Sequence, residues 1–145
     1  MKKYLFLIVA SIVVATSTAF GQSATINNDL SATYKGVNYQ YGQELMIGYG
    51  SGDNKNFAFI SVFRAEKGNN SIPSTTNLKA DDSKKKFVID EIYKTDAGKV
   101  FIKAVPEWLK EDGYTVDLRV DLEGAVDNKE ILVPIASKKV IKKHQ

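Results

Sequence analysis

Residues 87–105 read FVIDEIYKTDAGKVFIKAV and carry the strongest local folding signal of the chain. Two runs rich in β-branched and aromatic residues flank the turn Thr95-Asp96-Ala97-Gly98. Asp96 can accept hydrogen bonds from nearby backbone N–H groups, and Gly98 can take a positive φ without steric cost. The pattern predicts an antiparallel β-hairpin, and we expect the rest of the sheet to assemble on it.

The apolar pattern of this stretch changes phase in its first half. Phe87 and Ile89 share one face of a strand, but Ile92 follows after the acidic pair Asp90-Glu91. A β-bulge at the acidic pair would return Ile92 to the core and bend the strand. The second strand of the hairpin ends before Pro106, which lacks the N–H that a ladder requires.

Several other segments alternate apolar and polar residues and are separated by turn formers. The remaining strand candidates are residues 34–42, 43–50, 57–64, 114–122 and 131–135, and short helical turns are expected within 72–85, 107–113 and 123–130. The segment 114–122 alternates most regularly, which predicts one buried face and one wet face, the latter including Asp117 and Asp121. Short strands with turns between them predict an all-β, mainly antiparallel fold. A small SH3-like barrel is favoured, with an OB-like barrel or a sandwich as alternatives.

The ends of the chain differ in composition from its middle. Two lysines, an apolar run over residues 4–14 and small residues up to Gly21 are typical of a secretory signal peptide, cleaved near Gly21. The apolar run is short for a membrane span of about 20 residues. We therefore expect a signal peptide at 1–21, a loose N-terminal arm at 22–33, a single β domain at 34–136 and a basic tail at 137–145. The mature chain would be periplasmic or secreted, without a membrane span.

Charge and cysteine content limit the classes of function. The chain has no cysteine, so disulfides are excluded, and its formal net charge is +3. Loss of Lys2 and Lys3 with the leader would leave 18 basic and 17 acidic residues, a net charge of +1. A nearly neutral domain gives no general electrostatic attraction for nucleic acid, and none is expected as a partner.

Catalytic and metal-binding constellations are weak. The only histidine is His144 in the basic tail, so a nucleophile would have no credible base and a histidine-based metal site would have no ligands. Carboxylates occur in pairs but alternate with lysine and arginine, as on a solvated strand surface: Asp90/Glu91, Asp117/Asp121 and Asp121/Glu123. We expect a protein that is not an enzyme and has no cofactor.

Two loop features resemble ligand-binding loops only superficially. The glycine-rich segment 48–53 has neither the Walker A spacing nor the dinucleotide fingerprint. Asp53, Asn54 and Asn56 offer oxygen ligands, but the glycine and the distal glutamate of an EF-hand loop are missing. Both patterns are typical of a strand exit and a turn, and no metal is expected.

The aromatic residues give the best candidates for ligand contact. Trp108, the only tryptophan, follows Pro106 in a polar turn, and Tyr39, Tyr41 and Tyr49 lie near turns or on strand faces. Exposed tyrosine and tryptophan line grooves that bind peptides or sugars. The alternative is that these side chains pack over the ends of the core.

Three segments together resemble a group of small, secreted, functionally uncharacterised bacterial β proteins. They are YGQELMIGYGSGDNKNFAFI at 41–60, GKVFIKAV at 98–105 and YTVDLRVDLEGAVDNKEI at 114–131. The shared features are a Gly-x-Gly strand exit and a closing D-x-E-x-A…E-I segment, which are motifs of turns and packing. The resemblance implies a small exported β fold but carries no activity and no site residues.

These observations predict a non-catalytic binding or structural module of the bacterial cell envelope, with an envelope protein or a polysaccharide as its partner. The alternative is an accessory or inhibitor-like domain that acts on an envelope hydrolase or its polysaccharide. An open groove lined by Trp108 and tyrosines would favour ligand binding.

Overall fold

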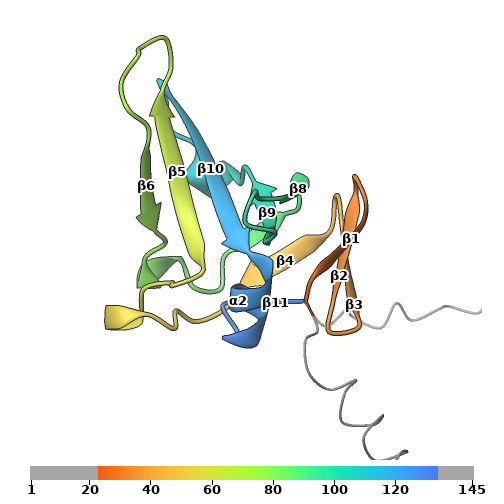
Figure 1. Cartoon of the computed structure of the whole chain (residues 1–145). Helices are drawn as coiled ribbons and strands as arrows, with labels where there is room; N and C mark the ends of the chain where they lie inside the picture. The colour runs from red at the N-terminus through yellow and green to blue at the C-terminus, as the bar shows by residue number, and fades with distance from the viewer. Residues whose placement is uncertain (1–22, 134–145) are drawn as a thin grey trace, which may run out of the picture.

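The computed structural model describes residues 23–133, which form three mainly antiparallel β-sheets (Figure 1). The expected signal peptide and basic tail lie outside these residues. The strands are β1 (Thr25–Asn28), β2 (Ser31–Tyr34), β3 (Val37–Gln40), β4 (Glu44–Ile47), β5 (Ile60–Glu66), β6 (Ser74–Asn77), β7 (Lys86–Val88), β8 (Glu91–Lys94), β9 (Val100–Ala104), β10 (Tyr114–Asp121) and β11 (Ile131–Leu132). The helical elements are the 3₁₀ turns η1 (Asp53–Lys55), η2 (Ala80–Asp82) and η3 (Glu107–Leu109) and the short helix α2 (Leu122–Asp127).

The strands pair in three separate groups. The largest sheet has the order β6-β5-β10-β9-β8, and two three-stranded sheets have the orders β1-β2-β3 and β11-β4-β7. The prediction of an all-β, mainly antiparallel fold is confirmed. The three sheets are not joined by strand pairing, so no closed barrel forms among residues 23–133. The expectation of a small closed barrel is therefore not met.

The hairpin predicted within residues 87–105 is confirmed as β8 and β9. Ile92 pairs with Ile102, and Lys94 pairs with Val100. Gly98 closes the turn with φ of 83°, and its N–H donates to the Thr95 carbonyl at 2.8 Å. The local signal of a turn former between two apolar runs was therefore sufficient for this element.

The expected bulge at Asp90-Glu91 is instead the point where the chain passes from one sheet to another. β7 pairs with β4, whereas β8 pairs with β9, and the two strands belong to different sheets. The change of sheet explains the slip in the apolar phase, because Phe87 and Ile92 both enter the core but from different sheets.

The segment 22–33 was expected to be a loose arm, but its described residues, 23–33, include β1 and most of β2. β1 pairs with β2, β2 pairs with β3, and Ala32 and Tyr34 of β2 are buried. This N-terminal sheet lies at one side of the molecule beside β8 (Figure 1). The expectation failed because most of the segment is polar and its few apolar side chains pack against residues distant in sequence.

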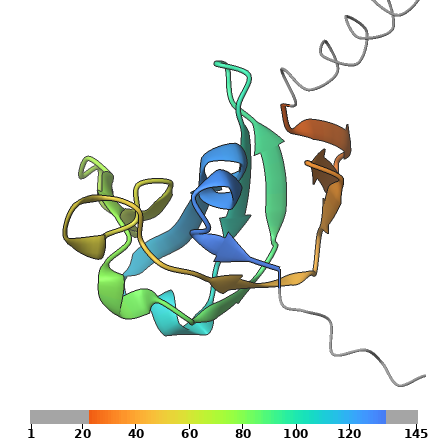
Figure 2. The same ribbon diagram turned by 90° about the horizontal axis from the view of Figure 1, so that it is seen from below.

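The core lies between the sheets, and α2 contributes Leu122 and Ala125 to it. α2 packs against β9, β10 and β11 (Figure 2). Its N-terminus is capped by Asp121, whose carboxylate accepts the Gly124 N–H. The largest fully buried apolar side chains are Tyr39, Leu45, Ile47, Phe57, Ile60, Leu78, Phe87, Ile89, Ile102, Leu118 and Leu122. Within residues 23–133, no helix is long and apolar enough to cross a membrane.

The face of β10 predicted to be wet is partly covered. Asp117 and Asp121 are only 3% and 8% exposed. Asp117 accepts a hydrogen bond from Arg119 Nε at 2.8 Å, and the Arg119 guanidinium lies 3.9 Å from the Phe63 ring centroid. A long arginine side chain stacked on an aromatic ring shields the carboxylate, which alternation alone does not reveal.

Candidate binding site

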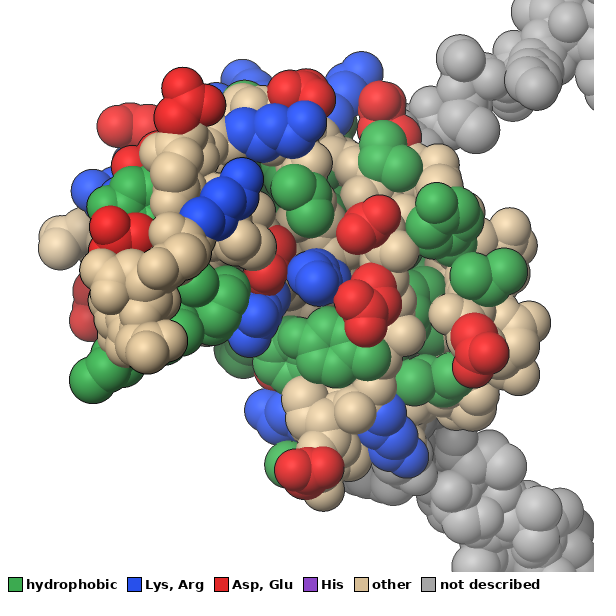
Figure 3. Space-filling model, turned by 90° about the horizontal axis from the view of Figure 1, so that it is seen from above, with side chains coloured by type: hydrophobic (Ala, Val, Ile, Leu, Met, Phe, Trp, Pro, Cys, Tyr) green, Lys and Arg blue, Asp and Glu red, His purple; other side chains and the backbone are tan. Residues whose placement is uncertain are grey.

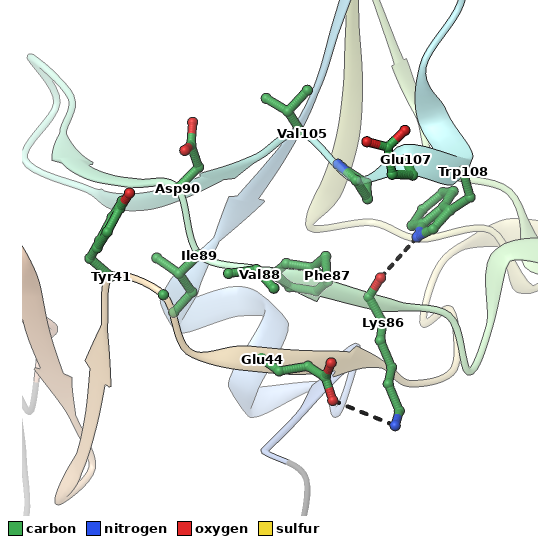
Figure 4. Close-up of a pocket in the computed structure, with 12 residues that line it drawn as sticks. Tyr41, Glu44, Lys86, Phe87, Val88, Ile89, Asp90, Val105, Glu107 and Trp108 are labelled. Carbon is green, nitrogen blue, oxygen red and sulfur yellow. Dashed lines mark hydrogen bonds and ion pairs between the residues drawn. The ribbon is translucent and has the colours of Figure 1, made fainter.

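A groove of about 450 Å³ runs beside β7, and we call it the β7 groove (Figure 4). One wall is β7 with the residues that follow it, and the other is the connection from β9 to η3. The lining residues are Tyr41, Gly42, Glu44, Lys86, Phe87, Val88, Ile89, Asp90, Val105, Pro106, Glu107 and Trp108. A volume of this size is typical of pockets that bind small ligands or short peptide segments.

Trp108 forms one end of the β7 groove and is held in place by the turn η3. Pro106 precedes the turn, and its carbonyl accepts the Leu109 N–H at 3.0 Å. The indole Nε1 of Trp108 donates to the Lys86 carbonyl at 2.8 Å, and the Lys85 ammonium lies 4.7 Å from the ring centroid. Trp108 is half-buried and packs against the core, so its ring is an anchored surface with a fixed orientation.

Tyr41 forms the opposite end of the groove. It follows β3 and precedes Gly42, which has φ of 79° and donates its N–H to the Ile89 carbonyl at 2.8 Å. The Tyr41 N–H donates to the Leu30 carbonyl at 2.8 Å, so its backbone is fixed while its side chain remains 57% exposed. Figure 4 shows Tyr41 and Trp108 on opposite sides of the β7 residues.

The edge of β7 that faces the groove has free backbone groups. Phe87 pairs with Leu45 of β4, and the Ile89 N–H donates to the Gln43 carbonyl at 2.9 Å. In an antiparallel ladder the alternate residues turn their N–H and C=O away from that partner. The alternate residues here are Lys86 and Val88. The Lys86 carbonyl accepts the indole N–H of Trp108, whereas the N–H and C=O of Val88 have no partner among residues 23–133.

The rim of the groove is acidic. Three carboxylates, those of Glu44, Asp90 and Glu107, line it together with one ammonium group, that of Lys86. Lys86 Nζ lies 3.5 Å from Glu44, and Glu107 pairs with Lys110. Asp90 forms no ion pair with any residue that the structure describes. Three carboxylates and one ammonium give the lining side chains a net charge of −2, and Lys85 and Lys110 lie next to the groove.

Two of the four predicted contact residues meet at this groove, and two do not. Trp108 and Tyr41 line it, whereas Tyr39 is only 2% exposed, and its burial raises the pKa of its hydroxyl. The prediction of Tyr39 as a contact residue is therefore wrong, because alternation along β3 turns its side chain into the core. Tyr49 is exposed but lines a separate hollow with Lys55 and Lys84.

Val88, Asp90 and Val105 are groove residues that the sequence did not nominate. Val88 and Asp90 were assigned to the inside of one continuous strand, so no free edge was expected there. The slip in the apolar phase at Asp90 was the available signal, since a chain that changes sheets leaves one of them with an open edge.

The described residues contain no group of three or more histidine, cysteine, aspartate or glutamate residues arranged to hold a metal ion.

On the face seen in Figure 3, basic and acidic side chains are interspersed among hydrophobic patches. No continuous positive patch is seen on this face of the described residues. Comparisons of the chain with family models, with curated proteins and with solved structures found no match.

Proposed function

We propose that this chain is an exported, non-catalytic binding module of the bacterial cell envelope that holds its ligand in the β7 groove. The observation that supports the proposal is the position of Trp108 and Tyr41 at the two ends of one groove. The proposed partner is an envelope protein or a polysaccharide, and the composition of the first residues supports export.

Anchored aromatic side chains suit ligand binding. The Trp108 ring is already fixed by its hydrogen bond to Lys86, so a ligand that covers it loses little side-chain entropy of the protein. The exposed ring of Tyr41 adds a second apolar contact with a polar end. Binding energy at protein surfaces is concentrated in such aromatic residues.

An accessory or inhibitor-like domain that acts on an envelope hydrolase or its polysaccharide is the second candidate. Its support is a neighbouring hollow on the N-terminal sheet, which shares Tyr41 with the β7 groove. Asn28, Asn38 and Gln40 line this hollow and offer amide donors and acceptors for sugar hydroxyls.

A finer assignment of the fold, SH3-like or OB-like, stays a prediction from the strand pattern.

The test is binding of the purified full chain to two immobilised probes, solubilised envelope proteins and cell-wall polysaccharide. We expect saturable binding to one probe, weakened at least about tenfold by Trp108→Ala, because hot-spot aromatics contribute on this scale. Tyr49→Ala is the matched control, since Tyr49 is exposed but lies outside the β7 groove. Equal binding by wild type and Trp108→Ala, or binding to neither probe, would refute the proposal.

A further inference from the structure

We infer that the ligand of the β7 groove is an extended, basic peptide that forms β-sheet hydrogen bonds with Val88. The inference rests on the proposed binding function and names the partner. It depends on three properties of the groove: a free strand edge, apolar walls and an acidic rim.

The free edge provides the hydrogen bonds. The N–H and C=O of Val88 turn away from β4 and have no partner among the described residues. An extended peptide can add to such an edge through one donor and one acceptor, as in β-augmentation. A ligand without backbone amides would leave this pair of groups to water.

The free edge is short and bounded at both ends. At one end Trp108 Nε1 donates to the Lys86 carbonyl at 2.8 Å, and at the other the Asp90 N–H donates to the Lys103 carbonyl at 3.0 Å. Folded proteins commonly cover or block exposed strand edges. Here these two hydrogen bonds occupy the edge at Lys86 and at Asp90 and leave only the backbone groups of Val88 between them free. The opening therefore fits one short extended segment and excludes addition of a long strand.

Apolar side chains flank the free backbone groups. Val88 and Val105 are 49% and 43% exposed, and they line the groove on its two walls. Side chains of an extended peptide alternate in direction, so one apolar residue can contact these valines while its neighbours point to the rim.

The carboxylates at the rim of the groove favour basic side chains on the peptide residues next to the one that contacts the valines. Asp90 is free of ion pairs within residues 23–133, and Glu107, although it pairs with Lys110, has a side chain that is 85% exposed. Lysine or arginine residues of the peptide would meet these carboxylates, whereas an acidic peptide would be repelled. Tyr41 adds an exposed ring face that also favours cations, whereas the Trp108 ring already has the Lys85 ammonium 4.7 Å from its centroid.

The test uses three synthetic heptapeptides that contain no tryptophan. One alternates lysine and valine, the second alternates glutamate and valine, and the third is the lysine–valine peptide with its backbone nitrogens methylated. Trp108 is the only tryptophan of the chain, so its emission reports on the groove directly. We expect saturable binding of the lysine–valine peptide alone.

Two variants of the protein test the geometry. Val88→Pro removes the free N–H without breaking a bond to β4, and we expect it to weaken binding about fivefold, while Val88→Ala keeps the N–H and preserves more of the affinity. Asp90→Asn should weaken binding about two- to fivefold and reduce its salt dependence. Asp81→Asn, an exposed aspartate outside the groove, is the control.

Equal binding of the methylated or the acidic peptide would overturn the inference, and so would full binding by Val88→Pro with an unchanged melting temperature. If no peptide binds while an envelope probe is still retained in a Trp108-dependent manner, the peptide inference is refuted and the proposed function stands. Absence of both interactions would refute both.

Discussion

The carboxylate of Glu130 accepts the backbone N–H of Phe59 at 2.8 Å across a separation of 71 residues. Its other oxygen accepts the N–H of Ala58 at 2.7 Å and both the N–H and the hydroxyl of Ser51, at 3.1 and 2.5 Å. Glu130 is fully buried, and no buried side-chain polar atom of the described residues lacks a partner. This carboxylate therefore fastens the loop between β4 and β5 to the end of α2.

Replacement of Glu130 by alanine should destabilise the fold strongly. Three backbone N–H groups would lose their acceptor, and unsatisfied buried donors cost roughly 1–3 kcal/mol each, so we expect a loss of about 3–5 kcal/mol. Urea denaturation of the full chain measures the change. Glu66→Ala is the control, since Glu66 is exposed, and it should change stability by less than about 0.5 kcal/mol. A loss for Glu130→Ala no larger than the control would show that the buried carboxylate is dispensable.

Gly124 of α2 allows the Phe59 ring to pack directly on the helix. A Cβ at this position would lie 2.0 Å from Cδ1 of Phe59. We expect Gly124→Ala to destabilise by about 1–3 kcal/mol through overpacking. In a Phe59→Leu background the same substitution should cost less, and the difference is the coupling of a double-mutant cycle measured by thermal unfolding. Additive effects would mean that the ring moves aside freely.

The parts of the fold that were predicted correctly are specified by neighbours in sequence. Gly98 is an example: its positive φ follows from a turn sequence between two apolar runs, and the β8–β9 hairpin needs no information from elsewhere. The alternation of β10 likewise identified a strand with one apolar face. Within the candidate site, Trp108 and Tyr41 were found because exposed aromatics stand out by residue type.

The parts that were missed depend on distant partners. The role of Glu130 requires amides from residues 51, 58 and 59, and nothing near Glu130 in sequence indicates them. Gly48 is similar, since a Cβ there would lie 2.1 Å from the Lys129 carbonyl oxygen. The free edge at Val88 was missed for the same reason, because an open edge is a property of the sheet and not of its strand.

Asp127 should make stability depend on pH in the acid range. Its carboxylate pairs with Lys35 Nζ at 2.6 Å and accepts the Tyr34 hydroxyl at 2.9 Å. These two groups, the Lys35 ammonium first, hold the pKa of Asp127 below its usual 3.8. The folded state then binds fewer protons than the unfolded state as the pH falls below about 4. The stabilisation is fully present above that pH and is lost as the pH falls through the folded pKa.

Urea denaturation between pH 5 and pH 2 tests this dependence. Wild type should lose more stability over this range than Asp127→Asn, which cannot titrate. Asp96→Asn, in the exposed turn of the β8–β9 hairpin, controls for the loss of a charge. Parallel curves for wild type and Asp127→Asn would contradict the pKa shift of Asp127. The ion pair of Arg64 with Glu111 is present in all three proteins and therefore cancels in the comparison.

Trp108 should behave as a partly exposed residue whose indole N–H has a structural role. Its emission should be quenched in part by acrylamide, because the ring is half-buried and lines the β7 groove. Trp108→Phe keeps a ring but removes the donor to the Lys86 carbonyl, which becomes a further free group on the β7 edge beside those of Val88. We expect a loss of about 1 kcal/mol, the net value of one hydrogen bond, and less than the ~3–5 kcal/mol of a core aromatic truncated to alanine.

The tyrosine at the other end of the groove provides the comparison. Tyr41→Phe removes a hydroxyl for which no hydrogen bond within residues 23–133 is seen, so it should leave the free energy of unfolding almost unchanged. A similar small loss for Trp108→Phe would mean that the indole N–H does not cap β7 in solution. The two variants together separate the structural bond of Trp108 from the contact surface that both rings offer to a ligand.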